Sequence, residues 1–293
     1  MPDETQKCFD QQINLKMPTF TSKQLAKRVF NKSGRIITSP IRIMPSFLII
    51  GAKKCGTTSL FNYLCEHPNI GAPTWKEISY FNIHFNRGNL WYKSFFPLLL
   101  PQQDSQLITG EATASYICCP QAPKRIAVTL PKVKLIVLLR NPIERAYSHY
   151  HHTKRIGKEQ LSFEEAIAKE DSRVEQIEHQ SRQLGIKDSP AYNYTYLSSG
   201  MYAKQLENWL SIFKQEQLLI LKSEDFFDRP EATFKQVLNY LELPEWSPQK
   251  YRKYNHNRYR QTIKPSTRKH LVEYFYPHNQ KLYQLLKTDF GWS

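Results

Sequence analysis

The segment at residues 45–68, PSFLIIGAKKCGTTSLFNYLCEHP, constrains the fold more than any other part of the chain. Residues 47–50 form a short continuous apolar run, which is typical of a strand buried on both faces of a parallel sheet. Residues 57–59 (TTS) can begin a helix, whose apolar side chains then recur at helical spacing until Pro68. Such a strand, loop and helix N-terminus turn free backbone N–H groups and the helix dipole toward the loop. The segment therefore predicts an anion-binding loop.

The position of the lysines in this loop narrows the choice of anion. Gly51 and Gly56 keep the glycine spacing of a nucleoside triphosphate loop, but Thr57 stands where such a loop requires lysine. The cations are instead Lys53 and Lys54, and no residue pair for holding Mg²⁺ is evident in the sequence. We expect a nucleotide 5′-phosphate that is neutralised by protein rather than by metal. The structural alternative is an ordinary strand-turn-helix with solvated lysines.

A second strand-helix unit carries another anion-binding side chain. Residues 134–139 are a further apolar run, followed by Arg140 and by Ser148 two turns into the adjoining predicted helix. A guanidinium at the end of a strand offers paired hydrogen-bond donors to a phosphate. Either unit alone is moderate evidence for an anion-binding site, and the two in this order, each preceded by a predicted strand, are strong evidence.

In this order, the two units resemble the PAPS-dependent sulfotransferases. These enzymes use 3′-phosphoadenosine 5′-phosphosulfate (PAPS) as the sulfuryl donor and release 3′-phosphoadenosine 5′-phosphate (PAP). The resemblance spans residues 45–293 and is closest to the heparan-sulfate type, N-deacetylase/N-sulfotransferase and 3-O-sulfotransferase. Three further segments carry it: residues 76–82 (KEISYFN), 200–210 (GMYAKQLENWL) and 289–292 (DFGW).

The resemblance implies roles for individual residues. Glu77 is implied as the general base, with Glu111 and the histidines at 149, 151 and 152 as other candidates, and Lys54 as the cation at the leaving oxygen. Arg140 and Ser148 are implied to bind the 3′-phosphate. The remaining implied donor-binding residues lie in the loop, the 200–210 segment and a basic C-terminal stretch: Lys53, Lys54, Cys55, Gly56, Thr57, Thr58, Ser59, Tyr202, Arg258 and Arg260.

Two departures from the heparan-sulfate enzymes leave the acceptor open. Those enzymes carry a cysteine-bridged hairpin before a basic C-terminal loop, whereas no cysteine follows Cys119 here and residues 254–265 are shorter. Ala112 stands where the eukaryotic glycan enzymes usually have lysine after the glutamate. The resemblance thus supports the donor, and we expect a small-molecule or glycan acceptor of unidentified structure.

Composition limits the partners and cofactors. The net charge of +15 predicts an anionic ligand, but the basic residues are dispersed rather than clustered, which does not favour nucleic acid. Five cysteines without a CxxC motif argue against a disulfide framework or a zinc site, and the histidines near residue 150 lack a distant partner. We expect no metal.

The order of predicted elements indicates an α/β fold, a mostly parallel central sheet flanked by helices as in P-loop kinases. A single domain at residues 41–293 follows an N-terminal extension at residues 1–40. Residues 154–190 are strongly polar, and we consider both a solvated helix and a lid for them. The other expected elements are strands at 107–110 and 218–221, helices at 122–130, 201–213 and 231–241, and an aromatic-rich loop at 74–101.

The sequence also leaves two alternative functions open and indicates where in the cell the protein is expected. The alternatives to a sulfotransferase are a small-molecule kinase that uses ATP and Mg²⁺, and a non-catalytic polyanion-binding module. The N-terminus starts acidic without a continuous apolar segment, and no run reaches transmembrane length. We therefore expect a cytoplasmic enzyme without integral membrane contact, more typical of bacteria than of animals.

Overall fold

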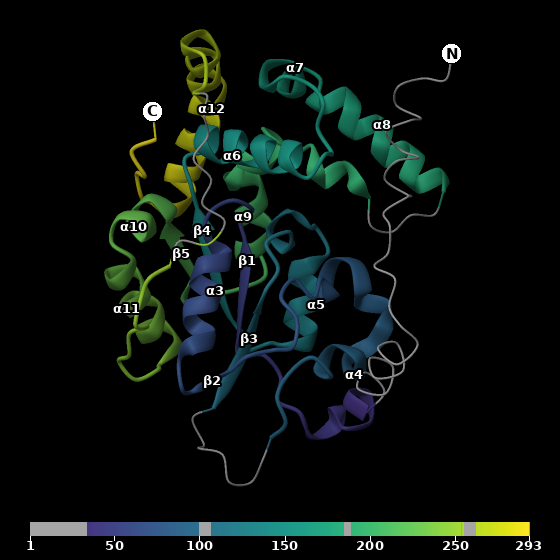
Figure 1. Ribbon diagram of the computed structural model, residues 1–293, viewed down its shortest axis with the longest axis vertical. Coiled ribbons are helices and arrows are strands. Elements are labelled where there is room, and N and C mark those ends of the chain that lie inside the picture. The colour runs from purple at the N-terminus through teal and green to yellow at the C-terminus, as the bar shows by residue number, and fades with distance from the viewer. Residues whose placement is uncertain (1–33, 100–106, 185–188, 253, 255–261, 293) are drawn as a thin grey trace.

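A five-stranded parallel sheet forms the centre of the protein (Figure 1). The computed structural model describes residues 34–99, 107–184, 189–252, 254 and 262–292. The strand order is β2-β3-β1-β4-β5, and every neighbouring pair is parallel. The strands are β1 (Phe47–Gly51), β2 (Ile70–Gly71), β3 (Ile108–Ala112), β4 (Lys134–Leu139) and β5 (Leu218–Lys222). The predicted α/β fold with a parallel sheet is confirmed.

The two apolar runs found in the sequence form the middle of this sheet. β1 and β4 are neighbours, with Phe47 opposite Lys134 and Ile49 opposite Ile136. The side chains of residues 47–50 and 135–139 are fully buried, because helices cover both faces of the sheet. The carboxyl ends of β1 and β4 therefore open on the same edge.

Helices connect the strands and cover the sheet. In Figure 1, α6 and α12 lie above the carboxyl end of β4, with α10 and α11 beside β5. The helices are α3 (Thr57–Glu66), α4 (Gly88–Lys93), α5 (Ala122–Thr129), α6 (Pro142–Arg155), α7 (Phe163–Ala168), α8 (Glu170–Gln183), α9 (Tyr202–Leu210), α10 (Ser223–Asp228), α11 (Pro230–Leu241) and α12 (Pro265–Leu286). The sequence did not predict α12 or the short strand β2.

The aromatic-rich segment is helical where a loop was expected. A π-helix at Tyr80–His84, a 3₁₀ turn at Phe85–Arg87 and α4 follow one another. The rings of Tyr80 and Tyr92 stack with their centroids 4.4 Å apart, and both side chains are buried. Burial of these rings against each other drives the coiling, which local periodicity did not reveal.

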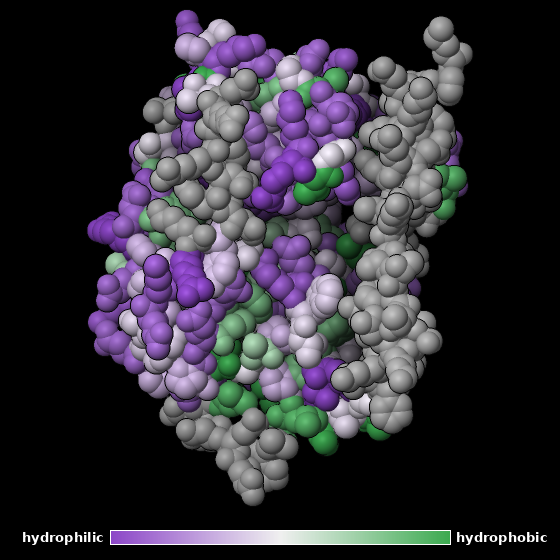
Figure 2. Space-filling model, in the orientation of Figure 1, coloured by the Kyte–Doolittle hydropathy of each residue, from purple (hydrophilic) through white to green (hydrophobic). Residues whose placement is uncertain are grey.

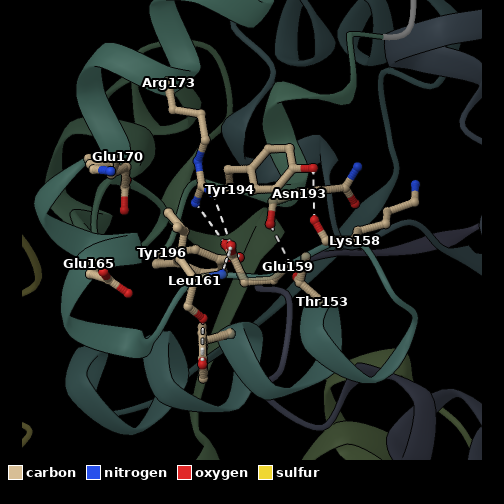
Figure 3. A network of polar contacts seen from close by, with 12 residues as sticks. Thr153, Lys158, Glu159, Leu161, Glu165, Glu170, Arg173, Asn193, Tyr194 and Tyr196 are labelled. Atoms are coloured by element: carbon tan, nitrogen blue, oxygen red, sulfur yellow. Dashed lines mark hydrogen bonds and ion pairs between the residues drawn. The ribbon is translucent and has the colours of Figure 1, made fainter. Parts of the chain in front are cut away.

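A buried ion pair anchors the polar segment that follows α6 (Figure 3). Glu159 accepts hydrogen bonds from Arg173 on α8 at 3.1 and 2.8 Å and from the Tyr196 hydroxyl at 2.7 Å. The Arg173 guanidinium also lies over the ring of Tyr194, 4.3 Å from its centroid. The segment is thus a pair of helices, α7 and α8, with α8 tied to the body of the protein. The lid, one of the two interpretations considered for this segment, stays untested.

The surface character differs between the two ends of the face seen in Figure 2. Hydrophilic residues dominate the upper part, above the strand ends, and apolar residues are more frequent toward the bottom. Within the described parts of the chain, no helix combines the length and the apolar character that crossing a membrane requires.

Replacing Arg173 by methionine tests the anchoring ion pair. The Glu159 carboxylate is 1% exposed, so Arg173→Met leaves a buried charge unpaired and lowers the free energy of unfolding by about 3 kcal/mol. Arg182→Met is the matched control, since Arg182 and its partner Glu178 are both more than half exposed. Urea denaturation measures both variants. Equal losses of unfolding free energy in the two variants would mean that the buried Glu159–Arg173 pair contributes no more than an exposed ion pair.

Candidate active site

The loop after β1 is shaped by two residues in left-handed conformations. Lys54 has φ 72° and Gly56 has φ 97°. A Cβ atom at Gly56 would lie 2.9 Å from the Phe227 ring, so both its conformation and its surroundings require glycine. Gly56 is also the N-cap of α3, and as a glycine it has no side chain to cap the helix. The N–H groups of its first turn are therefore available to a ligand.

Buried side chains hold this loop against the rest of the sheet. The Ser223 hydroxyl, at the end of β5, donates to the Cys55 carbonyl at 2.8 Å. The Tyr202 hydroxyl, at the start of α9, donates to the Arg140 carbonyl at 2.8 Å. The loop and the residue after β4 are thus fixed by neighbouring elements rather than by their own sequence alone.

A cavity of about 380 Å³ opens in front of the loop. The helix α3, the middle and later turns of α6, the aromatic residues of α10 and the chain around residue 251 enclose it. The lining residues are Lys53, Lys54, Gly56, Thr57, Thr58, Ser59, Tyr63, Glu77, Ala114, Arg140, Ser148, His152, Phe226, Phe227, Pro230, Tyr251 and Tyr254. Most of the residues predicted from the sequence meet in this one space.

Three cationic side chains face the cavity. None of Lys53, Lys54 and Arg140 forms an ion pair within the described residues. The Lys53 ammonium lies 4.7 Å from the centroid of the Tyr192 ring, and the Arg140 guanidinium lies 5.6 Å from that of Phe227. Arg140 also donates to the Lys54 carbonyl at 3.3 Å. Glu77, in the same lining, opposes only part of this charge, and the remaining excess of positive charge suits a polyanion.

The surroundings of the two lysines disfavour their charged forms and lower their pKa values. Burial, together with the nearby Arg145, lowers the pKa of Lys53 to about 7. Burial lowers the pKa of Lys54 to about 8, with Arg155 and Arg140 adding to the effect. An anion in the cavity would favour the charged forms and raise both pKa values again.

The helix α6 presents one side chain per turn to the cavity. Asn141 caps this helix by accepting from the Ile143 N–H, which fixes where it starts. Ser148 and His152, four residues apart, both line the cavity. Burial and the charges of Lys54 and Lys53 lower the pKa of His152 to about 4, so its imidazole is neutral at pH 7.

The other histidines of α6 are placed differently. His149 is fully buried, and burial beside Lys53 and Arg145 holds its pKa well below the usual value. Neither His149 nor His151 lines the cavity. Within the described residues, no cluster of histidine, cysteine and acidic side chains is arranged to hold a metal ion.

Glu77 reaches the cavity from the segment that precedes the π-helix. Its own φ is 58°, and its side chain is 57% exposed. The Lys76 ammonium lies 3.2 Å from its carboxylate and donates to the Thr58 hydroxyl at 2.9 Å. Lys76 therefore links the carboxylate to α3, a contact that the sequence did not reveal.

Glu111, the other carboxylate considered as a base, lies behind the cavity. It is fully buried at the end of β3 and does not line the cavity. Its carboxylate accepts from the hydroxyls of Tyr116 at 2.8 Å and Tyr92 at 2.9 Å. Burial raises its pKa to about 7, although these hydroxyls and Thr113 act in the opposite direction. A side chain in this place supports structure and has no direct access to a ligand in the cavity.

Several predicted residues lie outside the cavity lining or outside the described chain. Cys55 and Tyr202 are buried behind the loop, with the sulfur of Cys55 4.0 Å from the Tyr202 hydroxyl. Arg258 and Arg260 fall outside the described residues, as does most of the predicted N-terminal extension. The donor-binding roles of these residues stay predictions.

Sequence reasoning missed the aromatic wall of the cavity. Tyr63 lies one helical turn after Ser59, on the same side of α3. The other wall residues are Phe226, Phe227, Pro230, Tyr251 and Tyr254. The Phe226-Phe227 pair shortly after a predicted strand was the available signal, since the carboxyl ends of parallel strands share one edge.

Comparisons with known proteins agree with this geometry. Residues 44–278 match the sulfotransferase domain family. The chain is 30% identical to the membrane-associated sulfotransferase kil1 of Dictyostelium discoideum, over 85% of this chain and 67% of that protein. It is also 30% identical to human heparan sulfate glucosamine 3-O-sulfotransferase 3B1, over 85% of this chain and 65% of that protein. The crystal structure of a sulfotransferase from Alicyclobacillus acidocaldarius superimposes with a TM-score of 0.70 at 28% identity, covering 85% of this chain and 98% of that one.

The buried carboxyl of Glu111 predicts a pH dependence of stability. Its pKa is about 7 in the folded protein against 4.5 in the unfolded chain, so folding favours the protonated form. This contribution is present below pH 4.5 and is lost as the pH rises to about 7, a change on the order of 3 kcal/mol. Urea denaturation from pH 4.5 to 8 should show this fall relative to Glu111→Gln, which cannot titrate. Parallel pH profiles of the two proteins would contradict it.

Proposed function

Because the chain belongs to the sulfotransferase family, close to the heparan-sulfate type, we propose that it transfers a sulfuryl group from PAPS to a hydroxyl or amine of a carbohydrate or small molecule. Because the chain belongs to this family, the two alternative classes, a small-molecule kinase and a non-catalytic polyanion-binding module, are set aside. The curated relatives named above are longer than the chain, which spans about two thirds of their length.

The observation that carries the proposal is the group of cations at the uncapped end of α3. Lys53, Lys54 and Arg140 meet there without a carboxylate partner among the described residues, beside the first-turn N–H groups of the helix. PAPS brings two phosphates and a sulfate, which match this excess of positive charge. The aromatic wall gives its adenine a surface on which to pack.

The proposed donor contacts follow from the places of the side chains. Residues 56–59 cradle the 5′-phosphate with backbone N–H groups and hydroxyls. Arg140 and Ser148, from the strand end and the adjoining helix, bind the 3′-phosphate. Arg258 and Arg260 are proposed to add positive charge from the C-terminal stretch.

The proposed chemistry is a single in-line displacement at sulfur. The acceptor oxygen or nitrogen forms a bond to sulfur while the bond from sulfur to the 5′-phosphate oxygen breaks. Lys54 stabilises the negative charge that grows on this leaving oxygen, and Glu77 takes the proton from the acceptor. His152, neutral at pH 7 and also in the cavity, is the alternative proton acceptor.

The acceptor and the compartment call for direct experiments. A screen with labelled PAPS against carbohydrates, phenols and other small molecules would identify the acceptor class. The predicted cytoplasmic location is tested by fractionation of the source cells.

Arg140→Ala tests the proposed binding of the 3′-phosphate. Loss of charge-assisted hydrogen bonds worth roughly 1.5–3 kcal/mol should weaken PAP binding by about tenfold to a hundredfold. Adenosine 5′-phosphosulfate lacks the 3′-phosphate, so its affinity should scarcely change. Isothermal titration calorimetry measures both ligands, with Arg182→Ala as a control for the loss of one exposed positive charge. Equal losses for both ligands would mean that Arg140 does not read the 3′-phosphate.

Glu77→Gln tests the proposed general base. The variant keeps the shape of the side chain and removes its basicity, so kcat should fall by at least about a hundredfold while PAP affinity stays nearly unchanged. Initial rates with the acceptor found in the screen give kcat, and Glu175→Gln on the exposed face of α8 is the control. Near-normal turnover would exclude Glu77, and His152→Gln would be the next variant to measure.

A further inference from the structure

We propose that Glu111 is a positioning residue for Glu77, acting through two hydroxyl groups that hold the backbone at Ser79 and Phe81, where the chain runs from Glu77 into the π-helix. The functional half of this inference rests on the proposed role of Glu77 as the base. The structural half stands on the contacts of the buried carboxylate and can be tested without any activity.

Two side chains bridge Glu111 to the segment that carries Glu77. The Thr113 hydroxyl donates to one carboxylate oxygen of Glu111 at 3.4 Å and accepts from the Ser79 N–H at 3.3 Å. The Tyr116 hydroxyl donates to the other oxygen at 2.8 Å and accepts from the Phe81 N–H at 3.3 Å. Each hydroxyl is thus a donor toward the carboxylate and an acceptor toward the backbone.

The chemistry of a carboxylate explains this arrangement. An ionised carboxylate can only accept hydrogen bonds, and a hydroxyl has a single proton to give. The hydroxyl protons of Thr113 and Tyr116 must therefore point at Glu111, which leaves their lone pairs for the amides of Ser79 and Phe81. Polarisation along such a chain strengthens each bond in it.

The segment needs this support because its backbone is strained and its functional side chain is loosely packed. Glu77 and Ser79 both adopt left-handed conformations, at φ 58° and 55°, which are unfavourable for residues other than glycine. The Glu77 side chain is 57% exposed, so packing does not fix its direction. The backbone, tied to β3 by the Glu77 N–H donating to the Ala112 carbonyl at 3.1 Å, sets where the carboxylate starts.

Hydrogen exchange in the full chain tests the structural half. At pH 8, the Ser79 and Phe81 amides should exchange at least tenfold faster in Glu111→Gln, because the amide side chain replaces one acceptor oxygen by a donor. Thr113→Val removes one bridging hydroxyl at nearly constant shape and should free Ser79, whereas Thr113→Ser keeps the hydroxyl and should restore protection. The Thr113 pair decides the question if Glu111→Gln fails to fold.

Glu170→Gln is the matched control for a buried carboxylate. Glu170 is 2% exposed and accepts from the backbone N–H groups of Leu197 and Ser198. Its replacement should speed exchange at residues 197 and 198 and leave Ser79 and Phe81 unchanged. Unaltered exchange at Ser79 in both Glu111→Gln and Thr113→Val would overturn the proposal.

A double-mutant cycle tests the functional half. Glu111→Gln should lower kcat at least tenfold with the KM for PAPS and the affinity for PAP unchanged, and it should cause no further fall in a Glu77→Gln background. Equal falls in both backgrounds would overturn action through Glu77. Normal turnover of Glu77→Gln alone would instead refute Glu77 as the base, and the exchange data would still decide whether Glu111 positions the segment.

Discussion

The parallel pairing of β1 with β4 brings the anion-binding loop and Arg140 to one edge of the sheet, and the site depends on this adjacency. Each strand alone would end in an ordinary loop. Side by side, they direct cationic side chains from residues far apart in sequence toward the N-terminus of α3. Two hydroxyls from elements further along the chain then hold the segments that follow these strands. The Ser223 hydroxyl donates to the Cys55 carbonyl, and the Tyr202 hydroxyl donates to the Arg140 carbonyl.

Two buried carboxylates organise the regions around this edge in different ways. Glu159 is paired with the Arg173 guanidinium and ties α8 to the segment around Tyr196. Glu111 has hydroxyl donors instead of a cation, and its raised pKa reflects this difference. One carboxylate thus anchors an outer helix, and the other is linked through two hydroxyls to the segment that carries the proposed base.

The strongly patterned parts of the fold and site could be predicted from the sequence. The apolar runs that became β1 and β4, the glycine at position 56 and the positions of Arg140 and Ser148 follow from local chemistry and motif spacing. The burial of Glu111 could not be predicted, because it depends on packing between distant segments. The aromatic wall depends on such packing too, and only its Phe226-Phe227 pair left a signal in the sequence. The coiling near Tyr80 was missed for the same reason, since ring stacking with Tyr92 overrides a sequence without helical period.

The lowered pKa values of Lys53 and Lys54 make ligand binding a proton-coupled event. Without a bound anion, these lysines are partly deprotonated at neutral to mildly alkaline pH. A polyanion favours their charged forms, so its binding draws protons from the solvent. The observed heat of binding then depends on the ionisation enthalpy of the buffer. Affinity declines as the pH rises above about 7, where Lys53 loses its proton, and declines further above about 8, where Lys54 does. The affinity of the site for the proposed donor therefore depends on pH through the protonation of these two lysines.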